Sequence, residues 1–171
     1  MKIINTILKT LKGVYSELDG KASSLESLHK NRLHCKCECT YCCVDDLTVF
    51  EIEAEYIQQN HGVLLDFESP RPSGACAFLD NKGACRIYSS RPYVCRTQGL
   101  PLRWIEERDN GSIVEMRDIC SLNESGSPVE TLPEKECWTI GPFEGKLATL
   151  QAQLDKGKMR RVSLRSLFKG F

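Results

Sequence analysis

The sequence predicts a mainly helical domain of the α+β class with one short β-hairpin. Three observations support this prediction. Apolar residues recur at helical spacing near both ends of the chain, a turn motif separates two strand-like segments, and ten cysteines interrupt the pattern between the helices. The length of 171 residues is that of one domain. We therefore assign residues 1–171 to a single domain, with a leading helix over 1–30, a cysteine-rich core over 35–120, and a C-terminal helix and tail over 142–171.

The first helix is expected within residues 3–30, where apolar residues recur three and four positions apart. The series begins with Ile4, Ile7, Leu8 and Leu11. A break near Gly20 is the alternative to one continuous helix. A second helix is expected over 49–60, because Thr48 and Glu51 have the spacing of a capping box.

The remainder of the chain is expected to form loops, one hairpin and a last helix. Residues 66–75 contain two prolines and a glycine, which are typical of a loop. Two strand-like segments within 102–117 flank Asp109-Asn110-Gly111, which supplies a turn with positive φ. A second loop over 121–133 leads to the final helix, which we expect over 142–155.

The N-terminal residues do not have the pattern of a secretory signal, because Lys9 and Lys12 interrupt the apolar positions. The sequence has no stretch that approaches the eighteen or more apolar residues of a membrane helix. These features favour a cytoplasmic protein, in which clustered cysteines bind metal more often than they form disulfides. A disulfide framework is the alternative.

Five cysteines lie within residues 35–43, a density that isolated buried cysteines do not produce. Cys39 and Cys42 have the spacing with which two thiolates reach one metal ion from a tight turn. The adjacent pair Cys42-Cys43 favours more than one metal ion, since neighbouring side chains of an extended segment point to opposite sides. A second, more widely spaced set consists of Cys76, Cys85 and Cys95.

Several segments together carry a family pattern. They are the cluster over 35–43, Cys76-Ala-Phe-Leu-Asp, Gly83-Ala-Cys85-Arg-Ile-Tyr88, Arg91-Pro92-Tyr-Val-Cys95-Arg96-Thr97-Gln98-Gly99-Leu-Pro101-Leu and Cys120-Ser-Leu-Asn123. In combination they resemble the CxxCxxCC cysteine-cluster proteins, the YkgJ-like family of zinc- or iron-chelating domains. The resemblance implies the metal ligands Cys35, Cys39, Cys42, Cys43, Cys76, Cys85, Cys95 and Cys120.

Cys37 and Cys137 fall outside this pattern, and we expect Cys137 to be a buried thiol. Around the ligands we expect three supporting residues, the two arginines through charge-assisted hydrogen bonds to thiolates. The supporting residues are Arg91, Arg96 and Tyr88.

We therefore expect helices packed round an irregular cysteine-ligated metal centre, in a protein that chelates zinc or iron. Four thiolates satisfy zinc and iron–sulfur sites alike, and we rank zinc slightly ahead of iron or an iron–sulfur cluster. Metal binding and folding should be one event, since the segment between 62 and 102 has few apolar residues. The alternative is a metal-dependent protein-modifying enzyme, or an accessory to one, because the resemblance extends to domains linked to flagellin lysine N-methylase. The sequence contains no glycine-rich cofactor loop and no HExxH motif, so catalytic residues stay unassigned.

Lysine plus arginine and aspartate plus glutamate each total 23, and this net charge of zero argues against dedicated nucleic-acid binding. The charges are nevertheless segregated. Seven acids and no lysine or arginine lie between Val44 and Pro70, whereas residues 156–171 carry six bases and no acid. The two segments are either solvated separately, in contact with each other, or, for the basic tail, in contact with an unknown protein partner.

The basic tail also has an apolar stripe, formed by Leu164, Leu167, Phe168 and Phe171 at helical spacing. A short helix is therefore expected over 162–171. Because so short a helix is marginal in water, we expect it to dock on its own domain near the acidic 45–68 segment. Deletion of residues 158–171 should then lower stability and leave the metal content unchanged.

Overall fold

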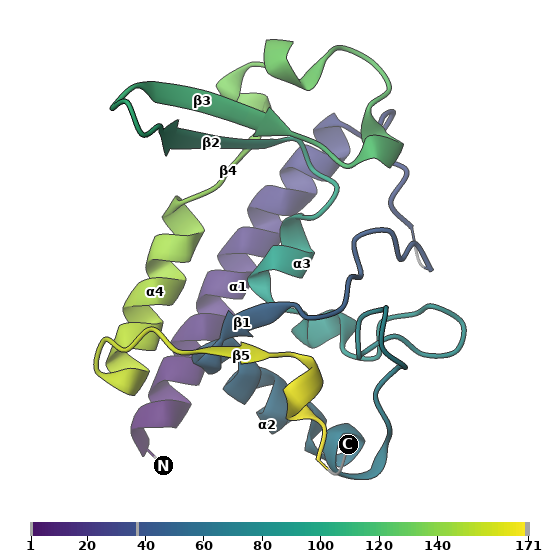
Figure 1. Ribbon diagram of the computed structural model, residues 1–171, viewed down its shortest axis with the longest axis vertical. Coiled ribbons are helices and arrows are strands. Elements are labelled where there is room, and N and C mark those ends of the chain that lie inside the picture. The colour runs from purple at the N-terminus through teal and green to yellow at the C-terminus, as the bar shows by residue number, and fades with distance from the viewer. Residues whose placement is uncertain (1, 37, 170–171) are drawn as a thin grey trace.

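The computed structural model describes residues 2–36 and 38–169. In this part of the chain, helices form most of the regular structure and short strands form two small sheets (Figure 1). The predicted α+β class is therefore confirmed. No helix in the described ranges is both long enough and apolar enough to cross a membrane. The elements, in chain order, are α1 Lys2–Leu28, β1 Thr48–Phe50, α2 Glu51–Phe67, α3 Tyr93–Thr97, β2 Leu102–Glu107, β3 Ile113–Asp118, β4 Trp138–Thr139, α4 Pro142–Asp155 and β5 Arg161–Ser163.

The leading helix α1 runs without a break through Gly13 and Gly20, and its apolar face forms much of the first core. Leu11 and Leu18 on that face are fully buried. The final helix α4 packs along α1, with the same bounds that its sequence pattern predicts (Figure 1). Each leucine buried in this way contributes roughly 1.5–3 kcal/mol, which offsets the low helix propensity of the two glycines.

The second helix begins two residues later than expected and is longer. Its first turn is closed by Glu53, which accepts the backbone amide of Phe50 at 3.2 Å. The predicted capping box at Thr48 is wrong, because Thr48 lies in β1 and is paired with Ser163 of β5. The helix bends at His61, where the backbone is not helical, and continues to Phe67.

The predicted hairpin is confirmed as β2 and β3, which pair antiparallel and are joined through a turn with Gly111 at φ 76°. The structure adds a strand that the sequence did not indicate. β4 pairs in parallel with β2, so that Trp138 lies opposite Leu102. Two residues are too few to show the alternation of a strand. Such a strand can be recognised only from where the rest of the chain places it.

The basic tail docks on the acidic segment, as expected, but it does not form the expected helix. β5 pairs antiparallel with β1, and a single 3₁₀ turn follows over Arg165–Leu167. Pairing with β1 satisfies backbone groups that a short isolated helix would leave exposed. Phe171, the last member of the predicted stripe, lies outside the described residues. Ion pairs join Arg160 to Glu51, Arg165 to Asp45 and Lys169 to Asp66 at 2.8, 2.6 and 2.9 Å.

A second apolar core lies under the loop that follows α2. Phe78 is fully buried, and its ring centroid lies 5.0 Å from that of Phe168 in the tail. Ile87 from the same loop and Leu164 from the tail are also buried in this core. Residues 62–102 supply only part of this core, and α2 and the tail supply the rest. This arrangement is consistent with the expectation that the segment has too few apolar side chains to organise itself.

Candidate metal centre

The predicted ligands lie on loops at one side of the molecule. The described segments over 34–36, 38–45, 70–92 and 119–123 run beside α1 and α3, on the side away from α4 (Figure 1). Cys95 reaches this side from the short helix α3. Each cysteine in the described ranges has a free thiol, and Cys37 lies outside those ranges.

Backbone hydrogen bonds shape the first cysteine segment and join it to the second. The amide of Cys39 donates to the carbonyl oxygen of Lys36 at 3.1 Å, and that of Cys43 donates to Thr40 at 2.9 Å. The carbonyl oxygen of Cys43 then accepts the amide of Cys76 at 3.0 Å. Since these groups lie on loops, the bonds replace the pairing that regular structure would give, and they hold Cys43 beside Cys76.

Cys76 and Cys85 are separated by a turn built on Asp80. Oδ1 of Asp80 accepts the backbone amides of Lys82 and Ala84, both at 2.8 Å. Cys85 forms an isolated antiparallel bridge across the turn. An aspartate that binds amides two and four residues later is typical of a tight loop. Asp80 therefore turns the chain so that Cys85 comes back toward Cys76.

Asn123 connects the late Cys-x-Leu-Asn element to the first cysteine. Its side chain is fully buried, and Nδ2 donates to Sγ of Cys35 at 3.3 Å and to the carbonyl oxygen of Gly99 at 2.9 Å. Oδ1 accepts the amide of His34 at 2.8 Å. Gly99 has φ 91°, and a Cβ at this position would overlap the sulfur of Cys35. Sequence reasoning included both residues in motifs but gave neither a role, although an amide three residues after a ligand cysteine was the available signal.

A buried carboxylate holds the start of α3, which carries Cys95. Oε1 of Glu53 accepts the amide of Tyr93 and the hydroxyl of Tyr15, both at 2.8 Å. Glu53 is 4% exposed, and this burial raises the pKa of its carboxyl group. Because Tyr93 is the first residue of α3, Glu53 ties the position of Cys95 to α2. The sequence gives no signal for this role, since Glu53 stands among the other acids of the charged segment.

Electrostatic interactions connect the predicted ligands as two overlapping thiol groups that are joined through Cys42. Repulsion from Cys39, Cys120 and Cys42 acts on Cys35, and these residues form the first thiol group. The second thiol group consists of Cys43, Cys76, Cys85 and Cys95, in which Cys76 repels each of the other three. Cys42 also interacts with Cys43 and Cys95, so it lies between the two groups.

Burial is the largest influence on several of these thiols. It raises the pKa of Cys35, Cys76 and Cys85, and it raises the pKa of Cys95 to about 12. Repulsion between neighbouring thiolates acts in the same direction. These sulfurs therefore carry protons at neutral pH in the absence of a metal ion, and a bound metal ion must displace them.

Cys42 and Cys43 contact each other instead of pointing to opposite sides. A side-chain hydrogen bond from Cys43 lowers the pKa of Cys42 to about 6, and the same contact raises the pKa of Cys43. The expectation of opposed side chains is wrong, because the chain forms a turn here and is not extended. The adjacency of these residues therefore gives no argument for the number of metal ions.

Of the three expected supporting residues, Arg91 acts on the thiols directly and Tyr88 contacts Arg91. The positive charge of Arg91 lowers the pKa of Cys42, and it opposes the rise in the pKa of Cys85 and Cys95. The guanidinium carbon of Arg91 lies 4.1 Å from the ring centroid of Tyr88, which is exposed. This stacking holds the cation beside the second thiol group.

Arg96, the third expected supporting residue, is buried and directs its hydrogen bonds to oxygen atoms. It binds both carboxylate oxygens of Asp19 on α1, at 2.7 and 2.9 Å. It also donates to the carbonyl oxygens of Arg91 and Ser89, at 2.7 and 3.0 Å, and stacks over Tyr15. Arg96 thus fastens α3 and the preceding loop to α1, and through them it positions Cys95.

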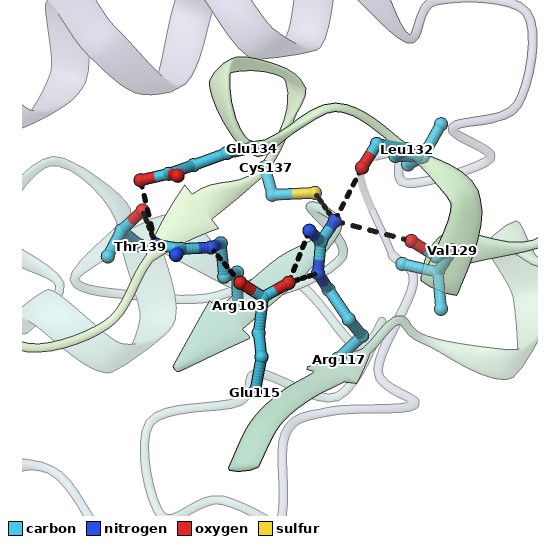
Figure 2. Close-up of polar contacts among 8 residues, drawn as sticks. All are labelled: Arg103, Glu115, Arg117, Val129, Leu132, Glu134, Cys137 and Thr139. Atoms are coloured by element: carbon cyan, nitrogen blue, oxygen red, sulfur yellow. Dashed lines mark hydrogen bonds and ion pairs between the residues drawn. The ribbon is translucent and has the colours of Figure 1, made fainter. Parts of the chain in front are cut away.

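Cys137 lies in a separate polar network on the sheet of β2, β3 and β4 (Figure 2). Its sulfur accepts a hydrogen bond from Nη1 of Arg117 at 3.0 Å, and Glu115 pairs with Arg117 and Arg103 in the same network. Cys137 is 6% exposed, and the expectation of a buried thiol at this position is confirmed.

The thiols are near one another but are not gathered at bonding distance. In the described ranges, no three histidine, cysteine, aspartate or glutamate side chains are placed so that they could hold one metal ion together. The metal centre expected from the sequence is therefore not formed in the structure. The donor set nevertheless suits zinc or iron, because thiolate sulfur is a soft ligand that magnesium and calcium do not prefer. Binding would require local movement of the loops that carry the sulfurs.

Loops that place thiols in two neighbourhoods on a helical scaffold define a cysteine-cluster protein with donors for soft metal ions. Residues 34–121, just over half of the chain, match the family model CxxCxxCC, described as "Putative zinc- or iron-chelating domain". The protein therefore belongs to the CxxCxxCC family, and the family assignment made from its motifs is confirmed. No curated protein and no solved structure matches the chain.

Proposed function

We propose that the protein chelates two metal ions through cysteine thiolates, one in each thiol group. The observation that supports this is that loops from distant segments bring eight thiols to one side of the molecule, where they interact as two groups joined through Cys42. Four thiolates complete the shell of a structural zinc ion or an iron–sulfur cluster. Cys35, Cys39, Cys42 and Cys120 would hold one metal ion, and Cys43, Cys76, Cys85 and Cys95 the other.

Zinc is the metal that we propose first, and iron or an iron–sulfur cluster is the alternative. Four thiolates and one divalent cation leave a net negative charge, which neighbouring donors and cations can offset. Asn123 offers such a donor to Cys35, and Arg91 brings a positive charge to the second thiol group. Because such a site needs reduced thiols, we propose that the protein acts in the cytoplasm.

Serine substitutions in each group, followed by elemental analysis, test this proposal. Cys120→Ser should abolish binding of one ion and Cys85→Ser of the other, since each removes one of four ligands. Cys137→Ser is the matched control and should retain both ions, because its sulfur is bound to Arg117 instead. Loss of metal in the control to the same extent as in the other two variants would overturn the proposed ligand sets.

A further inference from the structure

Arg165 joins the C-terminal tail to the two segments that carry Cys43 and Cys76. Its Nε and Nη2 donate to Oδ1 of Asp45 at 2.9 and 2.6 Å. Its Nη1 donates to the carbonyl oxygen of Arg71 at 2.6 Å, and Nη2 also donates to that of Ala75 at 2.9 Å. One guanidinium thus contacts the residue next to Cys76 and a residue two positions from Cys43.

The two cysteine segments meet each other at the same place. The amide of Cys76 donates to the carbonyl oxygen of Cys43 at 3.0 Å. Oδ2 of Asp45, the oxygen that Arg165 leaves free, accepts the amide of Gly74 at 2.9 Å. The side chains of Asp45 and Arg165 are 15% and 25% exposed, so this ion pair is partly shielded from water and from salt.

The position of Arg165 is fixed by apolar residues on both sides of it. Leu164, Leu167 and Phe168 are each less than 5% exposed and belong to the second core. The amide of Leu164 donates to the carbonyl oxygen of Leu47 at 2.9 Å. Arg165 is therefore held by packed neighbours, unlike a flexible surface base, and its planar fork matches the carboxylate and carbonyl oxygens that it binds.

The other ion pairs of the tail contact α2. Arg160 pairs with Glu51 and Lys169 pairs with Asp66. Both basic side chains are more than half exposed, so these pairs contribute little to stability. They provide controls that remove a charge from the same tail without touching a cysteine segment.

We propose that Arg165 is a positioning residue of the second thiol group, which holds Cys43 and Cys76 in register and thereby sets how tightly this group retains its metal ion. The inference rests on the proposed function and adds to it a control element from outside the matched residues 34–121. It also changes the expectation from sequence that loss of the tail leaves metal binding unaffected.

Anaerobic titration of the reduced, metal-free full chain with Co²⁺ tests this inference, since cobalt–thiolate absorption reports each binding step. Arg165→Met should weaken one of the two steps about tenfold, the usual effect of losing a residue that orients ligands, and should leave the other unchanged. Lys169→Met should titrate like the wild type. In a Cys120→Ser background only the second thiol group is intact, so a single binding step should remain. Arg165→Met should weaken that step.

Arg165→Lys and Asp45→Asn are milder variants for the same titration. Both should weaken the same step, and combining Asp45→Asn with Arg165→Met should add little, because each removes one shared contact. Equal affinities in Arg165→Met and Lys169→Met, with normal binding by the wild type, would overturn this inference alone. Equal weakening of both steps would indicate a general loss of stability and would also overturn it. A wild-type chain that binds no cobalt would overturn the proposed function together with the inference.

Discussion

Asn123 donates a hydrogen bond from Nδ2 to the sulfur of Cys35, 3.3 Å away and 88 residues earlier in the chain. The same nitrogen binds the carbonyl oxygen of Gly99, so one buried amide joins three segments that are far apart in the sequence. This contact places the first cysteine beside the Cys120 turn, which the spacing of the cysteines does not reveal.

Asn123→Ala should destabilise the fold and weaken metal binding at the first thiol group. The substitution leaves the amide of His34 without its acceptor and removes a donor from Cys35, a loss of about 2–3 kcal/mol for a fully buried amide. Chemical denaturation measures the stability, and cobalt titration measures the affinity. Ser125→Ala, an exposed neighbour, should change neither quantity. A variant as stable as wild type with normal affinity would show that the amide has no supporting role.

Gly99→Ala should disrupt the first thiol group, whereas Gly111→Ala should affect stability alone. Both glycines have positive φ, so both substitutions cost about 1–2 kcal/mol of backbone strain. Only at Gly99, of these two positions, would the added methyl group overlap the sulfur of Cys35. Metal content measured after purification should therefore fall in Gly99→Ala and stay normal in Gly111→Ala. The same metal content in both variants would contradict the close approach of Gly99 to Cys35.

Glu53→Leu should destabilise the protein by about 3–5 kcal/mol, because it leaves the Tyr15 hydroxyl and the Tyr93 amide buried without an acceptor. Glu53→Gln retains one carbonyl oxygen and should lose about half as much. Glu55→Leu, on the same helix and partly exposed, is the control and should stay within about 1 kcal/mol of the wild type. Thermal unfolding of the metal-free proteins distinguishes these outcomes. Equal stability of Glu53→Leu and Glu55→Leu would be incompatible with the buried network.

Metal affinity should rise steeply with pH. Burial raises the pKa of Cys35, Cys76 and Cys85, and raises that of Cys95 to about 12, so these four thiols are protonated at neutral pH when no metal ion is bound. Raising the pH removes protons with which the metal ion competes, and affinity should increase about tenfold per pH unit for each proton displaced. Competition with a chelator between about pH 6 and about pH 8.5 measures this slope. Affinity that does not change with pH would show that the ligands are already ionised or are not thiols.

Much of the fold follows from local patterns. The periodicity of α1, the proline and glycine around α4 and the Asp109-Asn110-Gly111 turn each indicate an element without reference to the rest of the chain. The strands β1, β4 and β5 have two or three residues each and exist because distant segments meet. The apolar spacing of the tail predicts a helix, because local spacing contains no sign of the pairing between β5 and β1. The contact of the tail with the acidic segment was correctly predicted from charge.

The sequence predicts which cysteines belong to the candidate site. It does not predict how these cysteines are arranged in space. Motifs identify the cysteines, because few proteins contain so many at such spacings. Partition into two groups depends on how the loops turn, as the contact between Cys42 and Cys43 illustrates. The residues that hold the loops, among them Asn123, Glu53 and Arg165, are ordinary in sequence and act only through tertiary contacts.

If eight thiols bind two metal ions, protein purified without oxygen must contain both ions. Native mass spectrometry with elemental analysis should find about two zinc or iron ions per chain. Alkylation of the native protein should leave the eight ligand cysteines protected until a chelator is added, whereas the buried Cys137 should resist alkylation with or without the chelator. Colourless protein would indicate zinc, and a brown colour would indicate an iron–sulfur cluster. Protein that carries no metal, or whose cysteines are paired as disulfides, would contradict the account.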